Sequence, residues 1–182
     1  MRIHTALLAL LLLFGCAACG TADDQPKMEL PIYPGGEATL EVNLAKEDIA
    51  PTIKAMLPLL TKGLGSKAEK VESEDVTSVL KAVDLIQVVQ VDIDKQDAGV
   101  KDIVSYYCAN IPSGKWSRIL WQTSEKTGTI ALYSKPDAEG LYGFRVRTVK
   151  QDEKTIKQVT AARIDGKVDM EKLAALAKKL LS

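Results

Sequence analysis

The chain has 182 residues, of which 24 are basic, 24 are acidic and 46% are hydrophobic. Balanced charge without a basic cluster argues against nucleic acid as a partner and against electrostatic binding to a membrane surface. The single histidine, His4, lies near the amino terminus. The remainder therefore lacks the imidazole used by Ser-His-Asp triads, Cys-His pairs and most zinc sites.

Residues 1–19 predict a signal peptide with a lipobox-like end. Arg2 precedes an apolar run from Ala6 to Phe14, and small residues follow it. A run of this length is too short to cross a bilayer, which takes roughly 20 residues. We therefore expect an exported chain on the periplasmic or surface side of a membrane in a bacterial cell envelope.

The end of this leader resembles the bacterial lipoprotein box. Leu13-Phe14-Gly15-Cys16 places a branched apolar residue three positions before a cysteine and a small residue directly before it. The resemblance implies lipidation of Cys16, with Cys19 as the alternative, and several acyl chains would anchor the protein firmly. Ordinary cleavage after Ala18 or Ala22 is the other interpretation, and it would give a soluble secreted protein.

Residues 20–36 predict a flexible tether. Its prolines and glycines, including Gly35-Gly36, oppose helix formation, and we expect order to begin near Leu30 to Tyr33. Residues 37–182 are then long enough for a single domain with its own core.

The first half of this domain mixes strands and helices. Alternating apolar residues predict a half-buried strand at 37–44, and a run apolar on both faces predicts a central strand at 85–93. Apolar residues at helical spacing predict helices that begin at Lys46, after Ser73 and at Ala98. Cys108 falls in the apolar stripe of the third helix, where a thiol behaves as a small buried hydrophobe.

The second half changes to strands at residues 116–124, 129–134, 142–148 and 155–164, joined by short polar turns. A helix at 169–181 follows. The prediction is an α+β fold: an antiparallel sheet of five or six strands, with a carboxyl-terminal four-stranded meander and helices packed on one face.

This order of elements, and above all Ala162-Arg163-Ile164-Asp165-Gly166 and the residues up to Leu173, resembles a small exported bacterial family of unknown function. Members of that family carry a lipoprotein-type leader and end in a strand, an Asp-Gly turn and a short helix. The resemblance covers roughly residues 40–181. It implies no catalytic residues.

The sequence predicts neither an enzyme nor a bound metal or other cofactor. Acidic residues near Asp92 lack a calcium loop, because Asp97 stands where that loop needs glycine and Ile103 where it needs glutamate. No carboxylate pair or Ser-Lys pair stands in a catalytic motif. The alternative to a binding domain is a carboxylate-dependent hydrolase or a divalent-metal-binding periplasmic protein.

The favoured hypothesis is an exported, lipid-anchored, non-catalytic envelope domain that binds a protein or a small ligand. Its partners would be the membrane, through the lipid, and an envelope protein; the sequence leaves the oligomeric state open. Aromatic residues concentrate in the meander and form the candidate binding face: Trp116, Trp121, Tyr133, Tyr142 and Phe144. The other interpretation of these five residues is core packing.

Overall fold

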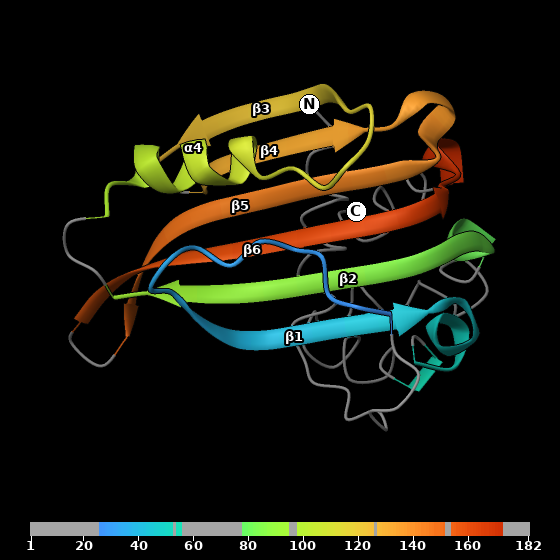
Figure 1. The fold of residues 1–182 in the computed structure, drawn as a ribbon, viewed down its shortest axis with the longest axis horizontal. Helices are drawn as coiled ribbons and strands as arrows, with labels where there is room; N and C mark the ends of the chain where they lie inside the picture. The colour runs from blue at the N-terminus through green and yellow to red at the C-terminus, as the bar shows by residue number, and fades with distance from the viewer. Residues whose placement is uncertain are drawn as a thin grey trace, which may run out of the picture.

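The structure is a computed structural model that describes residues 26–52, 54–55, 78–94, 98–125, 127–151 and 154–172. Its six strands are β1 (Glu37–Ala45), β2 (Ala82–Ile93), β3 (Ser117–Ser124), β4 (Gly128–Ser134), β5 (Gly140–Gln151) and β6 (Lys154–Lys167). They form one antiparallel sheet in the order β1-β2-β6-β5-β4-β3 (Figure 1). The fold is α+β, dominated by strands, and the predicted carboxyl-terminal meander is confirmed.

Strand β2 lies inside the sheet, between β1 and β6, as its apolar sequence predicts. Val88 and Val89 point to opposite faces, and both are buried. The strand begins at Ala82, three residues earlier than expected. Val83 therefore belongs to β2.

One face of the sheet, here called the helix face, carries Val89, Phe144 and Ala161. Helix α4 (Val100–Ala109) covers this face over β4 and β5, and buries Ile103, Val104 and Tyr107 against it. An extended segment, residues 26–36 and here called the strap, lies beside α4 and crosses β6, β2 and β1 (Figure 1). The hydroxyl of Tyr106 donates to the carbonyl of Ile32 at 2.8 Å and joins helix to strap.

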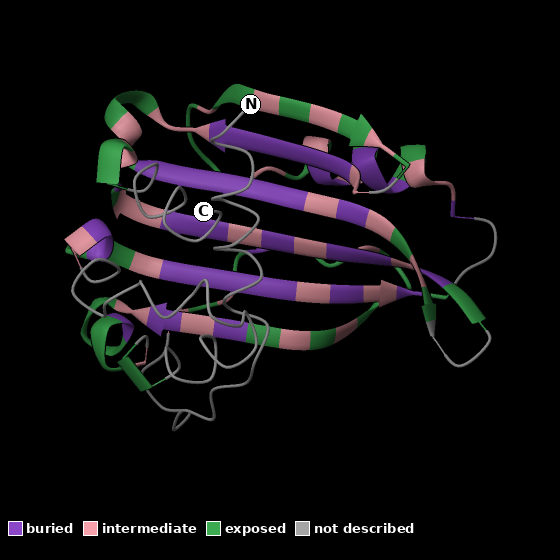
Figure 2. Cartoon of the chain, turned by 180° about the vertical axis from the view of Figure 1, so that it is seen from behind, coloured by how far each residue is buried: buried purple, intermediate pink, exposed green. Residues whose placement is uncertain are grey.

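The opposite face has a second cluster, formed at the end of the sheet where β2 begins and β6 ends. Val42, Val88 and Ile164 belong to it, together with Ile49 and Val79 from the helical residues 46–52 and 78–80. Buried residues accordingly run along the strands in the view from behind (Figure 2). Helical residues thus contribute to clusters on both faces, so the prediction of helices on one face alone was wrong.

A row of polar residues crosses the helix face at one register and holds the strap. Strand pairing aligns Asn43, Gln87, Arg163 and Tyr142 on neighbouring strands. Gln87 is fully buried, donates to the carbonyl of Lys27 at 2.8 Å and accepts from the backbone N–H of Glu29 at 3.3 Å. Asn43 donates to the carbonyl of Pro26, and Arg163 pairs with the carboxylate of Glu29.

These contacts correct the boundary of the domain. Residues 26–36 were expected to lie within a flexible tether, yet they pack on the sheet, and Leu30 is 5% exposed. Buried polar groups such as Gln87 need hydrogen-bond partners, and the strap backbone supplies them. The described domain therefore includes the chain from Pro26 onward, whereas residues 20–25 lie outside the described residues.

Two local predictions also change. The Asp165-Gly166 pair was expected to end the last strand, but β6 continues to Lys167 because Gly166 adopts φ +102° opposite a register shift in β2. Helix α4 begins at Val100, with Gly99 as its N-cap residue. Asp97, the end of the first predicted helix and residues 173–181 of the last predicted helix lie outside the described residues.

Candidate functional site

The five predicted aromatic residues gather on the helix face, mostly inside the core. Tyr142 and Phe144 are 0% exposed, and Tyr133 is 7% exposed. Trp116 is partly buried and donates its indole N–H to the carbonyl of Pro112 at 2.7 Å. This placement matches the core-packing interpretation for four of them, while Trp121 is 44% exposed.

Edge strand β3 carries two of the three exposed large hydrophobic side chains in the described part of the chain. Ile119 is 49% exposed, and Ile119, Trp121 and Ile32 are the exposed large hydrophobic residues in the described part of the chain. Figure 2 shows this contrast, with β3 largely exposed beside the buried β4. A register shift between Arg118 and Leu120 leaves Ile119 without a partner residue on β4, as in a β-bulge.

The backbone of β3 adds a second feature. Among the described strands β3 pairs with β4 alone, so one side of it offers its N–H and C=O groups to an added strand. The Arg118 guanidinium lies 5.1 Å from the Trp121 ring centroid, within the range of a cation–π contact. This contact restrains the indole while leaving much of it exposed.

The other edge of the sheet differs in chemistry. Strand β1 exposes the carboxylates of Glu37 and Glu41, and it has no exposed large hydrophobic residue. Charged side chains on an edge strand oppose pairing with another chain. The asymmetry between the two edges makes β3 the better candidate for protein binding.

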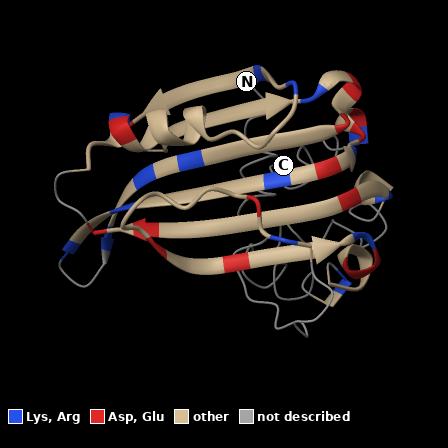
Figure 3. Ribbon diagram, viewed as in Figure 1, with Lys and Arg blue, Asp and Glu red and all other residues tan. Residues whose placement is uncertain are grey.

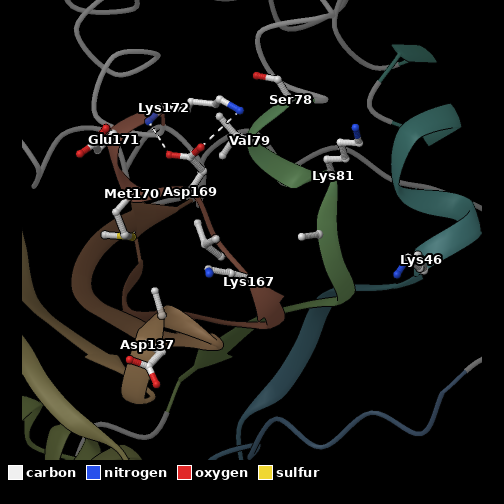
Figure 4. Close-up of a pocket in the computed structure, with 13 residues that line it drawn as sticks. Lys46, Ser78, Val79, Lys81, Asp137, Lys167, Asp169, Met170, Glu171 and Lys172 are labelled. Carbon is white, nitrogen blue, oxygen red and sulfur yellow. Dashed lines mark hydrogen bonds and ion pairs between the residues drawn. The ribbon is translucent and has the colours of Figure 1, made fainter.

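A pocket lies where β2 begins and β6 ends, with a cavity volume of about 670 Å³. Charged residues of both signs gather at this end of the sheet (Figure 3). The residues that line the pocket are Lys46, Ser78, Val79, Lys81, Ala82, Asp137, Ala138, Lys167, Val168, Asp169, Met170, Glu171 and Lys172 (Figure 4).

Ion pairs already engage part of this lining. Lys172 lies 3.3 Å from the carboxylate of Asp169, and Lys46 lies 2.7 Å from Asp84 outside the pocket. Because the lining combines charged side chains of both signs with apolar residues such as Met170, it selects no single class of ligand. The pocket is therefore a weaker candidate than the edge of β3.

Cys108 is half-buried rather than fully buried. Its sulfur lies 3.4 Å from the hydroxyl of Tyr133. Burial, helped by this contact, raises the pKa of Tyr133 to about 12. The phenol therefore stays protonated near neutral pH.

In the part of the chain that the structure describes, no three His, Cys, Asp or Glu side chains gather in a way that could hold a metal ion. The predicted lipidation residues Cys16 and Cys19 lie outside the described residues. None of the described helices is long and apolar enough to cross a membrane.

Comparison with known proteins gives no further assignment. No family model, curated protein or solved structure matches this chain. The resemblance to a small exported family of unknown function stays a prediction.

Proposed function

We propose that this chain is an exported, non-catalytic domain, lipid-anchored in a bacterial cell envelope, that binds another envelope protein along the free edge of β3. The observation that carries the binding part is the pair of exposed apolar residues on that edge, Ile119 and Trp121. Exposed apolar groups on an edge strand favour the addition of a partner strand.

The strap supports the anchored arrangement. Because Pro26 is fixed by Asn43, the nine residues 17–25 would be the whole link between a lipid on Cys16 and the sheet. Nine residues span at most about 32 Å. An anchored domain would therefore stay near the membrane surface, where envelope proteins are concentrated.

The anchor is tested by the intact mass of the mature protein from envelope fractions, compared for the natural chain, Cys16→Ala and Cys19→Ala. For the natural chain we expect the mass of an acylated polypeptide whose first residue is Cys16. Cys16→Ala should lose the acyl groups, whereas Cys19→Ala should keep them and differ in mass only by the substitution. A bare polypeptide mass for the natural chain would refute the anchor and would leave the binding edge untouched.

The binding edge is tested by a photo-cross-linking residue placed at Ile119 in cells that make the full chain. Thr39, exposed on the acidic edge strand β1, is the matched control position. We expect a discrete cross-link to an envelope protein from position 119 that disappears when Trp121→Glu is added. Equal cross-linking from both edges, or none from position 119, would contradict the proposal.

A further inference from the structure

Two arginines stand side by side on the face opposite α4. Arg145 and Arg147 are two residues apart on β5, so their side chains point to the same side with Cα atoms about 6.7 Å apart. Both side chains are half-buried. On the neighbouring strand β6, Thr160 pairs with Arg145 and Gln158 pairs with Arg147.

Neutral groups hold both guanidinium groups in place. Arg145 donates its Nε–H to the carbonyl of Thr127 at 2.8 Å. Arg147 donates from Nε and Nη2 to the amide oxygen of Gln158, at 3.0 and 2.6 Å. Gln158 is 8% exposed and donates in turn to the carboxylate of Asp92 at 2.9 Å. This chain of bonds fixes the direction of Arg147.

The positive charge is therefore only partly balanced. Within the described residues, neither arginine forms an ion pair, and Asp92 acts on Arg147 through the intervening amide. Burial lowers the pKa of Arg145, and the charge of Arg147 lowers it further. Arg163 differs, since it pairs directly with Glu29 and Asp165.

One side of Arg145 also stays available. Its Nε is engaged, but its two Nη groups make no hydrogen bond to any described residue. A guanidinium prefers oxyanions because its N–H groups match pairs of oxygens, and two guanidiniums suit a dianion better than a single carboxylate.

We propose that Arg145 and Arg147 form a binding site for a phosphate group. The site lies on the other face of the sheet from the strap, and it is independent of the proposed edge contact of β3. The phosphate group could belong to a soluble phosphate ester or to an anionic phospholipid headgroup.

Titration of the mature chain with inorganic phosphate at constant ionic strength, followed by amide NMR shifts, tests the site. We expect saturable shifts around Arg145 and Arg147. Arg145→Gln should weaken phosphate binding about tenfold or more, because it removes charge-assisted hydrogen bonds. The matched control is Lys150→Gln, which removes the same charge from an exposed position on β5 and should change affinity less than about twofold.

A second variant, Arg145→Lys, keeps the charge and should retain part of the affinity. Cosedimentation with phosphatidylglycerol vesicles separates the two sources. Binding to vesicles that is lost in Arg145→Gln would assign the phosphate to a lipid headgroup, whereas phosphate shifts without vesicle binding would assign it to a soluble ester. Shifts that never saturate, or equal losses in Arg145→Gln and Lys150→Gln, would overturn the proposal.

Discussion

Two adjacent tyrosines on α4 should respond in opposite directions to the loss of a hydroxyl group. Tyr107 is 0% exposed, and its hydroxyl has no hydrogen-bond partner among the described residues. Burial raises the pKa of the Tyr107 hydroxyl well above its ordinary value. The nearby backbone of Tyr33 lowers this pKa in part, although the two groups do not meet the geometry of a hydrogen bond. Tyr106, in contrast, donates to the carbonyl of Ile32 at 2.8 Å.

An unpaired buried hydroxyl costs roughly 1–3 kcal/mol. Because Tyr33 recovers part of this cost, we expect Tyr107→Phe to raise the free energy of unfolding by about 1 kcal/mol. For a domain of this size, that change raises the melting temperature by about 2–4 °C. Tyr106→Phe removes a satisfied bond between helix and strap, and should lower the free energy of unfolding by about 1 kcal/mol.

Urea unfolding of the protein, followed by tryptophan fluorescence, measures both changes at once. The dependence on urea should stay the same in the two variants, since neither alters the surface exposed on unfolding. If Tyr107→Phe lost 1 kcal/mol or more, its hydroxyl would have a partner and the reasoning would fail. If Tyr106→Phe had no effect, the contact between α4 and the strap would contribute nothing to stability.

Three further outcomes follow from burial and backbone geometry. Leu30→Ala should lower the free energy of unfolding by about 2–3 kcal/mol, because Leu30 is buried. Ile32 is 40% exposed, so Ile32→Ala should lower it by less than about 0.5 kcal/mol. Equal denaturation midpoints for the two variants would show that the strap is undocked. Gly166→Ala should cost at least about 2 kcal/mol, since φ is +102° and a Cβ would collide with the carbonyl of Ala82; a natural melting temperature would contradict this geometry. Because the pKa of Tyr133 is raised to about 12, its contribution to stability is complete below pH 10. Its contribution should then fall as the pH rises from 10 to 12, because the unfolded chain ionises first. Urea midpoints measured across that pH range check this, with Tyr133→Phe as the control. The midpoint of the natural chain should fall more steeply with pH than that of Tyr133→Phe.

The strands were predictable because their signals are local. Alternation over residues 37–44 and the run from Leu85 to Ile93 each occur within one segment, and both segments are strands. The turn between β3 and β4 was also predictable, since a short polar segment ending in Gly128 separates two strand-like runs. In the structure Gly128 adopts φ +76°. Boundaries were less accurate: β2 begins earlier and β6 ends later than the sequence indicates, around a register shift that only pairing reveals.

The candidate sites depended on information that no single segment contains. Trp121 could be named as a candidate, but Ile119 was missed because its exposure comes from a bulge between β3 and β4. Arg145 and Arg147 were visible as alternating residues in one strand. Their neutral partners, Thr127 and Gln158, come from a turn and from the next strand.

The sequence by itself determined the strand segments, helix α4, the meander and the presence of a single histidine, His4, because composition and periodicity are properties of the chain. Only the tertiary structure decided that the strap belongs to the domain. The strap is held by hydrogen bonds between residues far apart in the sequence. Gln87 bonds to Lys27, 60 residues away, and Arg163 bonds to Glu29, 134 residues away. Partners at such separations meet only when the sheet order is set, so the pairing of strands decides which polar residues are satisfied and which edge stays free.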